Sequence, residues 1–192
     1  MLFRSLKVFG PSKAAAELEG SKVFCKNLLH TANIPTATYQ SFRTAEEATR
    51  YVKERYPEPD DAAAVVVKAD GLAAGKGVIV CDSRTEALEA IDRIAERKEF
   101  GAAGNELIIE EKLVGMEASV LAITDGDTII TLPAAQDHKP AYDGDLGPNT
   151  GGMGAYCPTP IVNEAMMERI EADVLVPVVH AMKRARRPFK GV

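Results

Sequence analysis

The sequence predicts an α+β protein in which a compact β-α-β-β-α-β unit is inserted into a larger domain. Short apolar runs of strand length alternate with segments whose apolar residues recur every three or four positions, the spacing of an amphipathic helix. Thr44 with Glu47 and Ser83 with Glu86 form capping boxes, which mark the starts of two helices. A long Gly-, Asp- and Pro-rich segment, residues 136–160, shows no period.

The first half of the chain supplies the inserted unit. A helical region is expected from Pro11-Ser12 to about His30, because apolar residues four apart follow one another there, and Asn33-Ile-Pro35 ends it. Strands are expected at residues 37–42, 64–69, 77–80 and 106–111, and helices at 44–56 and 83–95. We therefore assign residues 36–109 to the inserted domain, and residues 1–35 and 110–192 to the outer domain.

The second half begins with a hairpin and ends with a helix. Residues 117–124 and 128–132 flank Asp125-Gly126, a strong hairpin signal. The segment 136–160 is too long for a simple connection, so it is either disordered or a functional loop. Asn163 is expected to cap a last helix over residues 164–187, with a kink at Pro177.

Composition and charge exclude several classes of protein. The 192 residues are 46% hydrophobic and 27% charged, with a net charge of -5, which argues against a dedicated nucleic-acid binder. The three cysteines are far apart and form no C-x-x-C pair, which argues against a disulfide framework or a zinc site and favours the reducing cytoplasm. No leader peptide and no membrane-spanning run is recognisable.

The stretch VVVKADGLAAGKGVIV, residues 65–80, raises the question of phosphate binding. It is not a P-loop, because only three residues separate Gly71 from Gly75 and no hydroxyl follows Lys76. The dinucleotide fingerprint G-x-G-x-x-G is not satisfied either. Two strands joined by a glycine loop can instead close over a triphosphate, with Lys68 as a fixed charge. The alternative is a mobile turn with a solvated lysine.

Two further segments carry polar groups in a suggestive order. In IIEEKLVGMEASV, residues 108–120, a strand ends in two carboxylates; the following linker could face a purine, and Glu117 could accept from ribose hydroxyls. The alternative is a strand end with solvated acids. Residues 136–160 hold several charged side chains and a Gly-Gly-Met-Gly run, which lets the backbone approach a ligand closely.

Four passages, spread over most of the chain, together resemble the ATP-grasp enzymes and, among them, the phosphoribosylamine–glycine ligase family. They are FGPSKAAAELEGSKVFCK (residues 9–26), VVKADGLAAGKGVIV (66–80), IIEEKLVGMEASV (108–120) and QDHKPAYDGDLGPNTGGMGAYCPTP (136–160). The resemblance implies an ATP-grasp fold, with a complete B (lid) subdomain at residues 36–109 inserted in an A domain that is cut at its C-terminal end.

The resemblance also implies roles for individual residues. Lys22 and Lys68 would contact ATP phosphates under a lid formed by residues 71–77, and Glu110 would lie near the adenine amino group. The expected nucleotide contacts are Lys22, Lys68, Gly71, Gly75, Lys76, Gly77, Glu110, Glu111, Leu113 and Glu117. The expected substrate contacts are Asp137, His138, Lys139, Asp143, Asp145, Asn149, Thr150, Gly151, Gly152 and Met153.

The implied reaction joins glycine to 5-phosphoribosylamine through a glycyl phosphate, with ATP and Mg²⁺ or Mn²⁺. No catalytic nucleophile is expected, since positioning and charge stabilisation by Lys22 and Lys68 would suffice. The resemblance places the metal ligands beyond Val192, so we expect the chain to be a piece of a longer, monomeric protein and to be inactive alone. The partners would be small molecules, with no nucleic acid and no membrane.

Three other interpretations remain open from the sequence. The chain could belong to another ATP-grasp ligase or carboxylase that acts on a different acid. It could be a nucleotide-binding fragment that needs further segments for activity. It could also be a plain α+β interaction module whose glycine loop is only a turn, which would not bind ATP.

Overall fold

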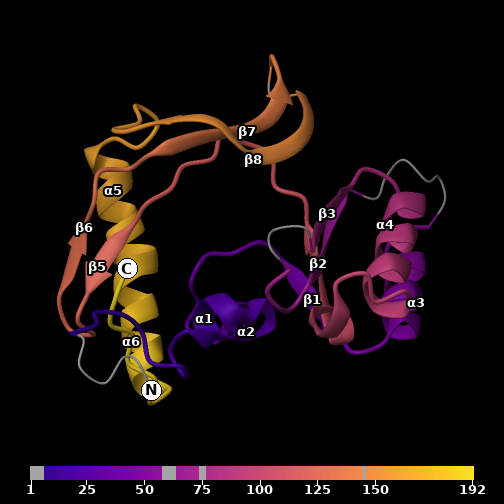
Figure 1. The fold of residues 1–192 in the computed structure, drawn as a ribbon, viewed down its shortest axis with the longest axis horizontal. Coiled ribbons are helices and arrows are strands. Elements are labelled where there is room, and N and C mark those ends of the chain that lie inside the picture. Colours follow the sequence, from indigo (N-terminus) through magenta and orange to yellow (C-terminus); the bar gives the residue numbers. More distant parts are fainter. Residues whose placement is uncertain (1–6, 58–63, 74–76, 145) are drawn as a thin grey trace. The chain divides into compact units, whose positions relative to one another are not determined.

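The computed structural model describes residues 7–57, 64–73, 77–144 and 146–192 (Figure 1). The chain divides into two compact units: Ala16–Val114, called the central unit, and Met1–Ala15 with Gly115–Val192, called the flanking unit. This division places residues 16–35 with the inserted segment, whereas the sequence-based domains separate at residues 35 and 36. The assignment of A and B subdomains stays a prediction.

The central unit is built on a four-stranded antiparallel sheet in the order β1-β4-β2-β3. Its strands are β1 (Tyr39–Phe42), β2 (Val65–Ala69), β3 (Val78–Cys81) and β4 (Leu107–Glu111). Its helices are α1 (Glu17–Gly20), α2 (Lys22–Thr31), α3 (Ala45–Arg55) and α4 (Arg84–Ile91), with a π-helical turn η2 (Asp92–Glu96) and a 3-10 turn η3 (Gly101–Asn105). The predicted strands and the two capped helices are therefore confirmed, within a few residues at their ends.

The two faces of this sheet differ in chemistry. Successive side chains of a strand point to opposite faces, and in β2 Val65, Val67 and Ala69 are fully buried while Lys68 lies on the other face. The apolar face packs against α3 and α4, and α2 lies on the opposite side of the sheet (Figure 1). The hydrophobic core thus occupies one face and leaves the other for polar groups.

The helix starts follow the predicted capping residues. The Oγ1 of Thr44 accepts a hydrogen bond from the amide of Glu47, and the Oγ of Ser83 accepts one from the amide of Glu86, both at 3.2 Å. The helical region expected from Pro11-Ser12 to about His30 is confirmed only in part: residues 13–16 form turns, and two helices, α1 and α2, follow. Ser21 has an extended backbone and caps a new helix, α2, through the amide of Phe24 at 3.0 Å, so the helical region is split there.

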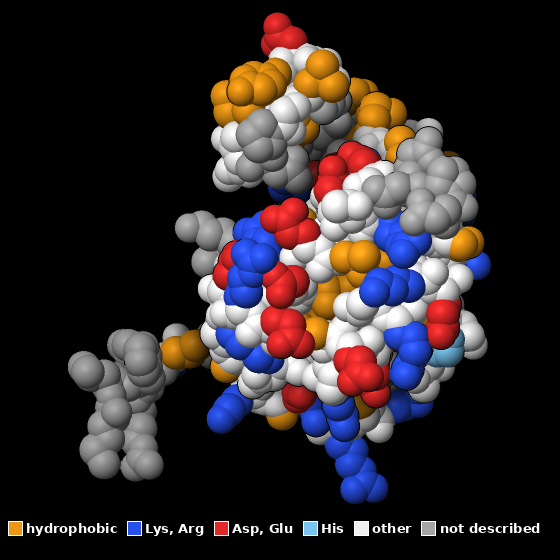
Figure 2. Space-filling view, turned by 90° about the vertical axis from the view of Figure 1, so that its right-hand side faces the viewer, with side chains coloured by type: hydrophobic (Ala, Val, Ile, Leu, Met, Phe, Trp, Pro, Cys, Tyr) orange, Lys and Arg blue, Asp and Glu red, His pale blue; other side chains and the backbone are white. Residues whose placement is uncertain are grey.

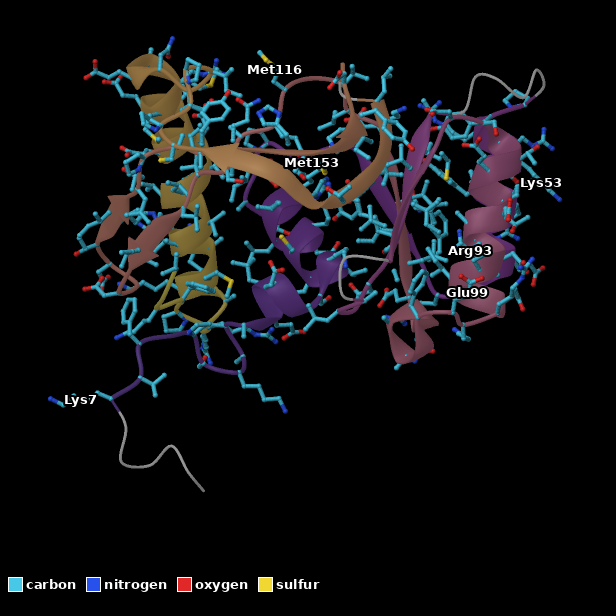
Figure 3. All side chains as sticks on the ribbon, turned by 45° about the horizontal axis from the view of Figure 1, so that its top comes forward. Lys7, Lys53, Arg93, Glu99, Met116 and Met153 are labelled. Atoms are coloured by element: carbon cyan, nitrogen blue, oxygen red, sulfur yellow. The ribbon has the colours of Figure 1, made fainter. Side chains whose placement is uncertain are left out.

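Charged side chains cover the outer face of α3 and α4. Figure 2 shows Lys and Arg interspersed with Asp and Glu on this face, around a shallow hollow of about 570 Å³. Glu46, Arg50 and Asp92 are among its lining residues. Arg93 forms an ion pair with Glu99 at 3.0 Å, and both are labelled in Figure 3. Mixed signs indicate a solvated surface.

The flanking unit contains the predicted hairpin and C-terminal helix, but the first strand of the hairpin is shorter than the predicted range 117–124. The strands β5 (Ala122–Thr124) and β6 (Ile129–Thr131) pair around Asp125-Gly126, where the amides of Thr128 and Asp127 donate to Asp125 and lower the pKa of its carboxyl. Asn163 caps α5 (Glu164–Ile170), as predicted. A π-helical turn, η4 (Glu171–Leu175), leads into α6 (Val176–Arg184). Pro177, which was expected to kink the helix, lies in the first turn of α6, directly after this wider turn.

The described residues of the segment 136–160 lie mostly in two paired strands, which the sequence did not predict. They form a long antiparallel hairpin of β7 (Gln136–Tyr142) and β8 (Leu146–Tyr156), with register shifts around Pro140. The strands were not predicted because the glycines of β8 hide the alternation that identifies a strand, and a functional role of the segment stays a prediction. Within the described part of the chain, no helix combines the length and the apolar character that a membrane span requires.

Candidate functional site

A cavity of about 970 Å³ lies on the polar side of the sheet in the central unit. One wall is the face of α2 formed by Lys22, Cys25, Lys26 and Leu29. These positions have the i, i+3, i+4, i+7 spacing that brings side chains onto one side of a helix. The other walls are formed by Lys68, Val78 and Glu110 of the sheet, by the ends of the glycine loop at Leu72, Ala73 and Gly77, and by Leu113.

Two lysines share one carboxylate in this cavity. The Nζ of Lys26 lies 3.2 Å from the Oε2 of Glu110, and the Nζ of Lys68 lies 3.0 Å from the same oxygen. Lys26 and Glu110 are only 8% and 5% exposed, so the carboxylate neutralises buried charge. Lys26, Lys68 and Glu110 are called here the two-lysine cluster. Because it has two ammonium groups and one carboxylate, it carries one uncompensated positive charge.

Lys26 is held rigidly. Besides its ion pair with Glu110, its ammonium donates to the Oγ1 of Thr36 at 2.7 Å and to the carbonyl of Ala37 at 3.0 Å, so three oxygen atoms surround it. The ammonium also lies 5.3 Å from the ring centre of Tyr39. Burial raises the pKa of Tyr39, whose hydroxyl donates to Asn27 at 2.7 Å.

Lys68 is the more available of the two cations. Sheet register places it diagonally across from Glu110, since Lys68 pairs with Ile108 and Val66 pairs with Glu110. Among the described residues, Glu110 is the single hydrogen-bond acceptor of its ammonium, and its side chain is 25% exposed. Two N–H donors of Lys68 therefore remain for a ligand in the cavity.

The ends of the glycine loop are closely packed. A Cβ at Gly77 would lie 2.6 Å from the Cβ of Ala73 and 3.2 Å from that of Ala69, so only glycine fits without displacement. Gly71 lies at the other end, and its carbonyl accepts a hydrogen bond from the Nζ of Lys22 at 3.1 Å. Gly75 and Lys76, which were predicted to contact nucleotide, lie outside the described residues.

The predicted adenine-side residues separate into two groups. Glu110 and Leu113 line the cavity, and Leu113 is 70% exposed. Glu111 does not line it: its Oε1 accepts a hydrogen bond from the amide of Thr38 at 2.9 Å. Sequence reasoning missed Lys26. Its place on one helical face with Lys22 and Leu29 could have indicated it, but its partner Glu110 is distant in sequence.

A second polar cluster lies in the flanking unit. The Nζ of Lys139 lies 3.0 Å from Glu117 and 3.6 Å from Asp137, so three residues predicted to contact nucleotide or substrate meet. The hydrogen bond to Glu117 raises the pKa of Lys139. The exposed ring of His138 stacks on that of Tyr156 at 5.7 Å between centroids.

The remaining predicted substrate contacts lie at the turn and on β8. Asp143 lies in the turn and is exposed, and Asp145 and the side chain of Asn149 lie outside the described residues. The Oγ1 of Thr150 accepts from the amide of Gly152 at 3.0 Å, and Gly152 has φ +117, which favours glycine there. Gly151 and Met153 are also on β8, and Met153 is 64% exposed (Figure 3).

A metal site was not expected within this chain. In the parts that the structure describes, no group of three or more His, Cys, Asp or Glu side chains is placed to hold a metal ion. The acids of both polar clusters are paired with lysines instead. The position of the metal ligands stays a prediction.

Comparison with known proteins identifies the family. The family model described as the phosphoribosylglycinamide synthetase ATP-grasp (A) domain matches residues 20–192. A phosphoribosylamine–glycine ligase of Rhodopirellula baltica is 74% identical over 187 residues, which are 97% of this chain and 43% of the relative. The chloroplastic phosphoribosylamine–glycine ligase of Arabidopsis thaliana is 48% identical over 96% of this chain and 34% of the relative. The chain thus spans less than half of these relatives.

Solved structures agree on the fold. The crystal structure of a phosphoribosylamine–glycine ligase from Thermotoga maritima matches with a TM-score of 0.86 and 33% identity, covering 99% of this chain and 46% of the other. A D-alanyl-alanine synthetase A from Vibrio cholerae, only 14% identical, matches 97% of this chain and 53% of its own with a TM-score of 0.71, which shows a common fold alone. The chain therefore has the ATP-grasp fold and belongs to the phosphoribosylglycinamide synthetase family.

Proposed function

We propose that this chain is the ATP-binding part of a ligase that joins glycine to 5-phosphoribosylamine in purine biosynthesis. The observation that carries the proposal is the two-lysine cluster in a cavity of about 970 Å³ beside a glycine loop. Its excess positive charge suits a polyphosphate, and Lys68 has N–H donors to offer. The names of the relatives supply the substrates.

The cavity supports binding of ATP with its phosphates at the lysines. Lys68, and Lys26 behind it, would neutralise the β- and γ-phosphates, and Leu113 would lie against the purine. In the proposed reaction the carboxylate of glycine attacks the γ-phosphorus, and ADP leaves. The amine of phosphoribosylamine then attacks the acyl carbon of the glycyl phosphate, and phosphate leaves. The protein's contribution is positioning, charge stabilisation and exclusion of water.

The flanking unit supports a substrate role through its own cluster. Lys139, between Glu117 and Asp137, together with the backbone of the glycine-rich strand β8, offers donors and acceptors for a small polar substrate. Mg²⁺ or Mn²⁺ would supply further charge neutralisation at the phosphates. We propose a cytoplasmic, monomeric protein that acts on small molecules and binds neither nucleic acid nor membrane.

Binding of nucleotide to this chain is the first test. ATP should raise its unfolding temperature, because a ligand that binds only the folded state stabilises it by about 2.7 kcal/mol at a hundredfold excess over Kd. Lys68→Ala should abolish the shift. Lys53→Ala is the matched control, since Lys53 lies on α3, on the opposite side of the sheet, and loses the same charge (Figure 3). An equal shift in Lys68→Ala and the original chain would contradict the proposed phosphate site.

The ligase reaction is tested on the full-length gene product. ADP release should require both glycine and phosphoribosylamine. Release with another acid and amine pair would instead support the alternative of a different ATP-grasp ligase. Nucleotide binding without any release would support a nucleotide-binding role.

A further inference from the structure

We propose that Asp70 is a positioning residue that fixes the two lysines of the cavity relative to each other. The inference rests on the proposed function, because the effect of Asp70 on the lysines is measured through the affinity of the chain for ATP. Asp70 directly follows β2, two residues after Lys68, and begins the glycine loop. It is not part of the two-lysine cluster and none of the motif-based roles includes it.

The side chain of Asp70 holds the first turn of α2. Its Oδ1 accepts from the amide of Val23 at 2.7 Å, and both carboxylate oxygens lie near the hydroxyl of Ser21, at 3.0 and 3.2 Å. The same hydroxyl accepts from the amide of Phe24 at 3.0 Å. A carboxylate at this end of a helix also interacts favourably with the helix dipole. Asp70 therefore acts as a second cap, supplied from another element.

The backbone beside Asp70 completes the connection. The carbonyl of Asp70 accepts from the amide of Lys22 at 3.2 Å, and the carbonyl of Gly71 accepts from the Nζ of Lys22 at 3.1 Å. The amide of Asp70 donates to the carbonyl of Glu106 at 3.0 Å, immediately before β4. One residue thus joins the three elements that supply the two-lysine cluster.

The positions of the cluster residues follow from these bonds. Lys26 lies one helical turn after Lys22 on α2, and Lys68 lies on the strand that Asp70 ends. Because the two ammonium groups reach a single oxygen of Glu110, a small displacement of α2 against β2 would separate them. Such displacement lowers affinity for a ligand that needs both charges.

The test compares three variants of this chain by calorimetric titration with ATP. Asp70→Ala should weaken ATP binding by about tenfold, which corresponds to about 1.4 kcal/mol. Asp70→Asn should bind within about threefold of the original chain, because the amide oxygen can still accept from Val23. Thr44→Ala is the matched control: it removes the cap of α3 without touching the cavity.

Hydrogen exchange in the absence of nucleotide separates this inference from the proposed function. Asp70→Ala should accelerate exchange at the amides of Lys22, Val23 and Phe24, and Thr44→Ala should not. If the original chain binds no ATP, the proposed function fails, and exchange alone decides the positioning role. Unchanged exchange in Asp70→Ala, or equal loss of ATP affinity in Asp70→Ala and Thr44→Ala, would overturn the inference.

Discussion

Cys81 shows how burial sets the chemistry of a single residue. It ends β3, its side chain is fully buried in the core, and burial raises the pKa of its thiol to about 11 from the usual 9.0. Since the thiolate is the reactive form, a buried and protonated thiol is inert. Cys157 is exposed and offers an internal comparison.

The first prediction concerns this thiol. Iodoacetamide at pH 8 should label Cys157 at least about a hundred times faster than Cys81, measured by mass spectrometry of the folded chain. The folded pKa lies above the unfolded one, so the stability linked to Cys81 is complete below about pH 9 and is lost as the pH rises toward about 11. In Cys81→Ala, the free energy of unfolding should no longer fall with this pH dependence between about pH 9 and about pH 11, whereas Cys157→Ala should show the same fall as the original chain. Equal labelling of both cysteines would refute the prediction.

The two lysines of the cavity differ in how well the sequence predicts their place in it. The position of Lys68 could be predicted, because a lysine at the end of a strand precedes a glycine loop in one short stretch, whereas its contact with phosphate stays a prediction. Lys26 could not, since its role depends on Glu110, Thr36 and Ala37, which only folding brings together. The helical spacing from Lys22 could place Lys26 on the same face of α2, but it contains no signal of these three contacts.

At the scale of elements, two short helical turns of the central unit pack in close backbone contact. The 3-10 turn η3 contains the buried Gly104, and a Cβ there would lie 2.1 Å from the carbonyl oxygen of Ile94 in the π-helical turn η2. Backbone atoms cannot move aside as a flexible side chain can. The helix predicted over residues 83–95 includes most of η2, because a π turn continues the sequence pattern of α4 without a break, whereas η3 was not predicted.

We expect Gly104→Ala to lower the free energy of unfolding by about 2 kcal/mol, within the range for overpacked interiors. Gly20→Ala is the control in the same unit: no atom lies within 4 Å of its added Cβ, and its φ is not in the left-handed region. This change should be neutral or slightly stabilising. Urea unfolding of the two variants measures the difference, and equal midpoints would be inconsistent with the close packing described.

Elements were predictable where a residue's own chemistry marks their ends. Thr44, Ser83 and Asn163 cap the helices that they were expected to cap, because a cap is a contact between neighbours in sequence. The hairpin of β7 and β8 could not be predicted in this way. Its strands carry few side chains that alternate, and their pairing depends on backbone hydrogen bonds, which leave little trace in the sequence.

At the scale of the molecule, the chain has two units with cores of very different size. The central unit buries a large apolar cluster that includes Ile94, which is fully buried. The flanking unit buries fewer apolar side chains among the described residues, with Met182 the largest that is fully buried. A unit with its own core is expected to open as a unit.

The third prediction follows from this division. Ile94→Ala and Met182→Ala each remove several buried carbon atoms, and each should cost about 2–5 kcal/mol. Native-state hydrogen exchange should show lost protection confined to residues 16–114 for Ile94→Ala and to the flanking unit for Met182→Ala. Loss of protection throughout the chain in both variants would mean that the two units unfold together.

Strand β4 has a consequence for heritable variation. Its Leu107 and Ile109 belong to the core, whereas Glu110, on the other face, holds the two lysines. A substitution therefore damages either the core or the two-lysine cluster, which we propose binds the phosphates of ATP. Deletion of one codon within β4 damages both, because a shift by one residue turns every following side chain to the opposite face. Among natural variants, β4 should tolerate substitution of one apolar residue by another far better than any insertion or deletion.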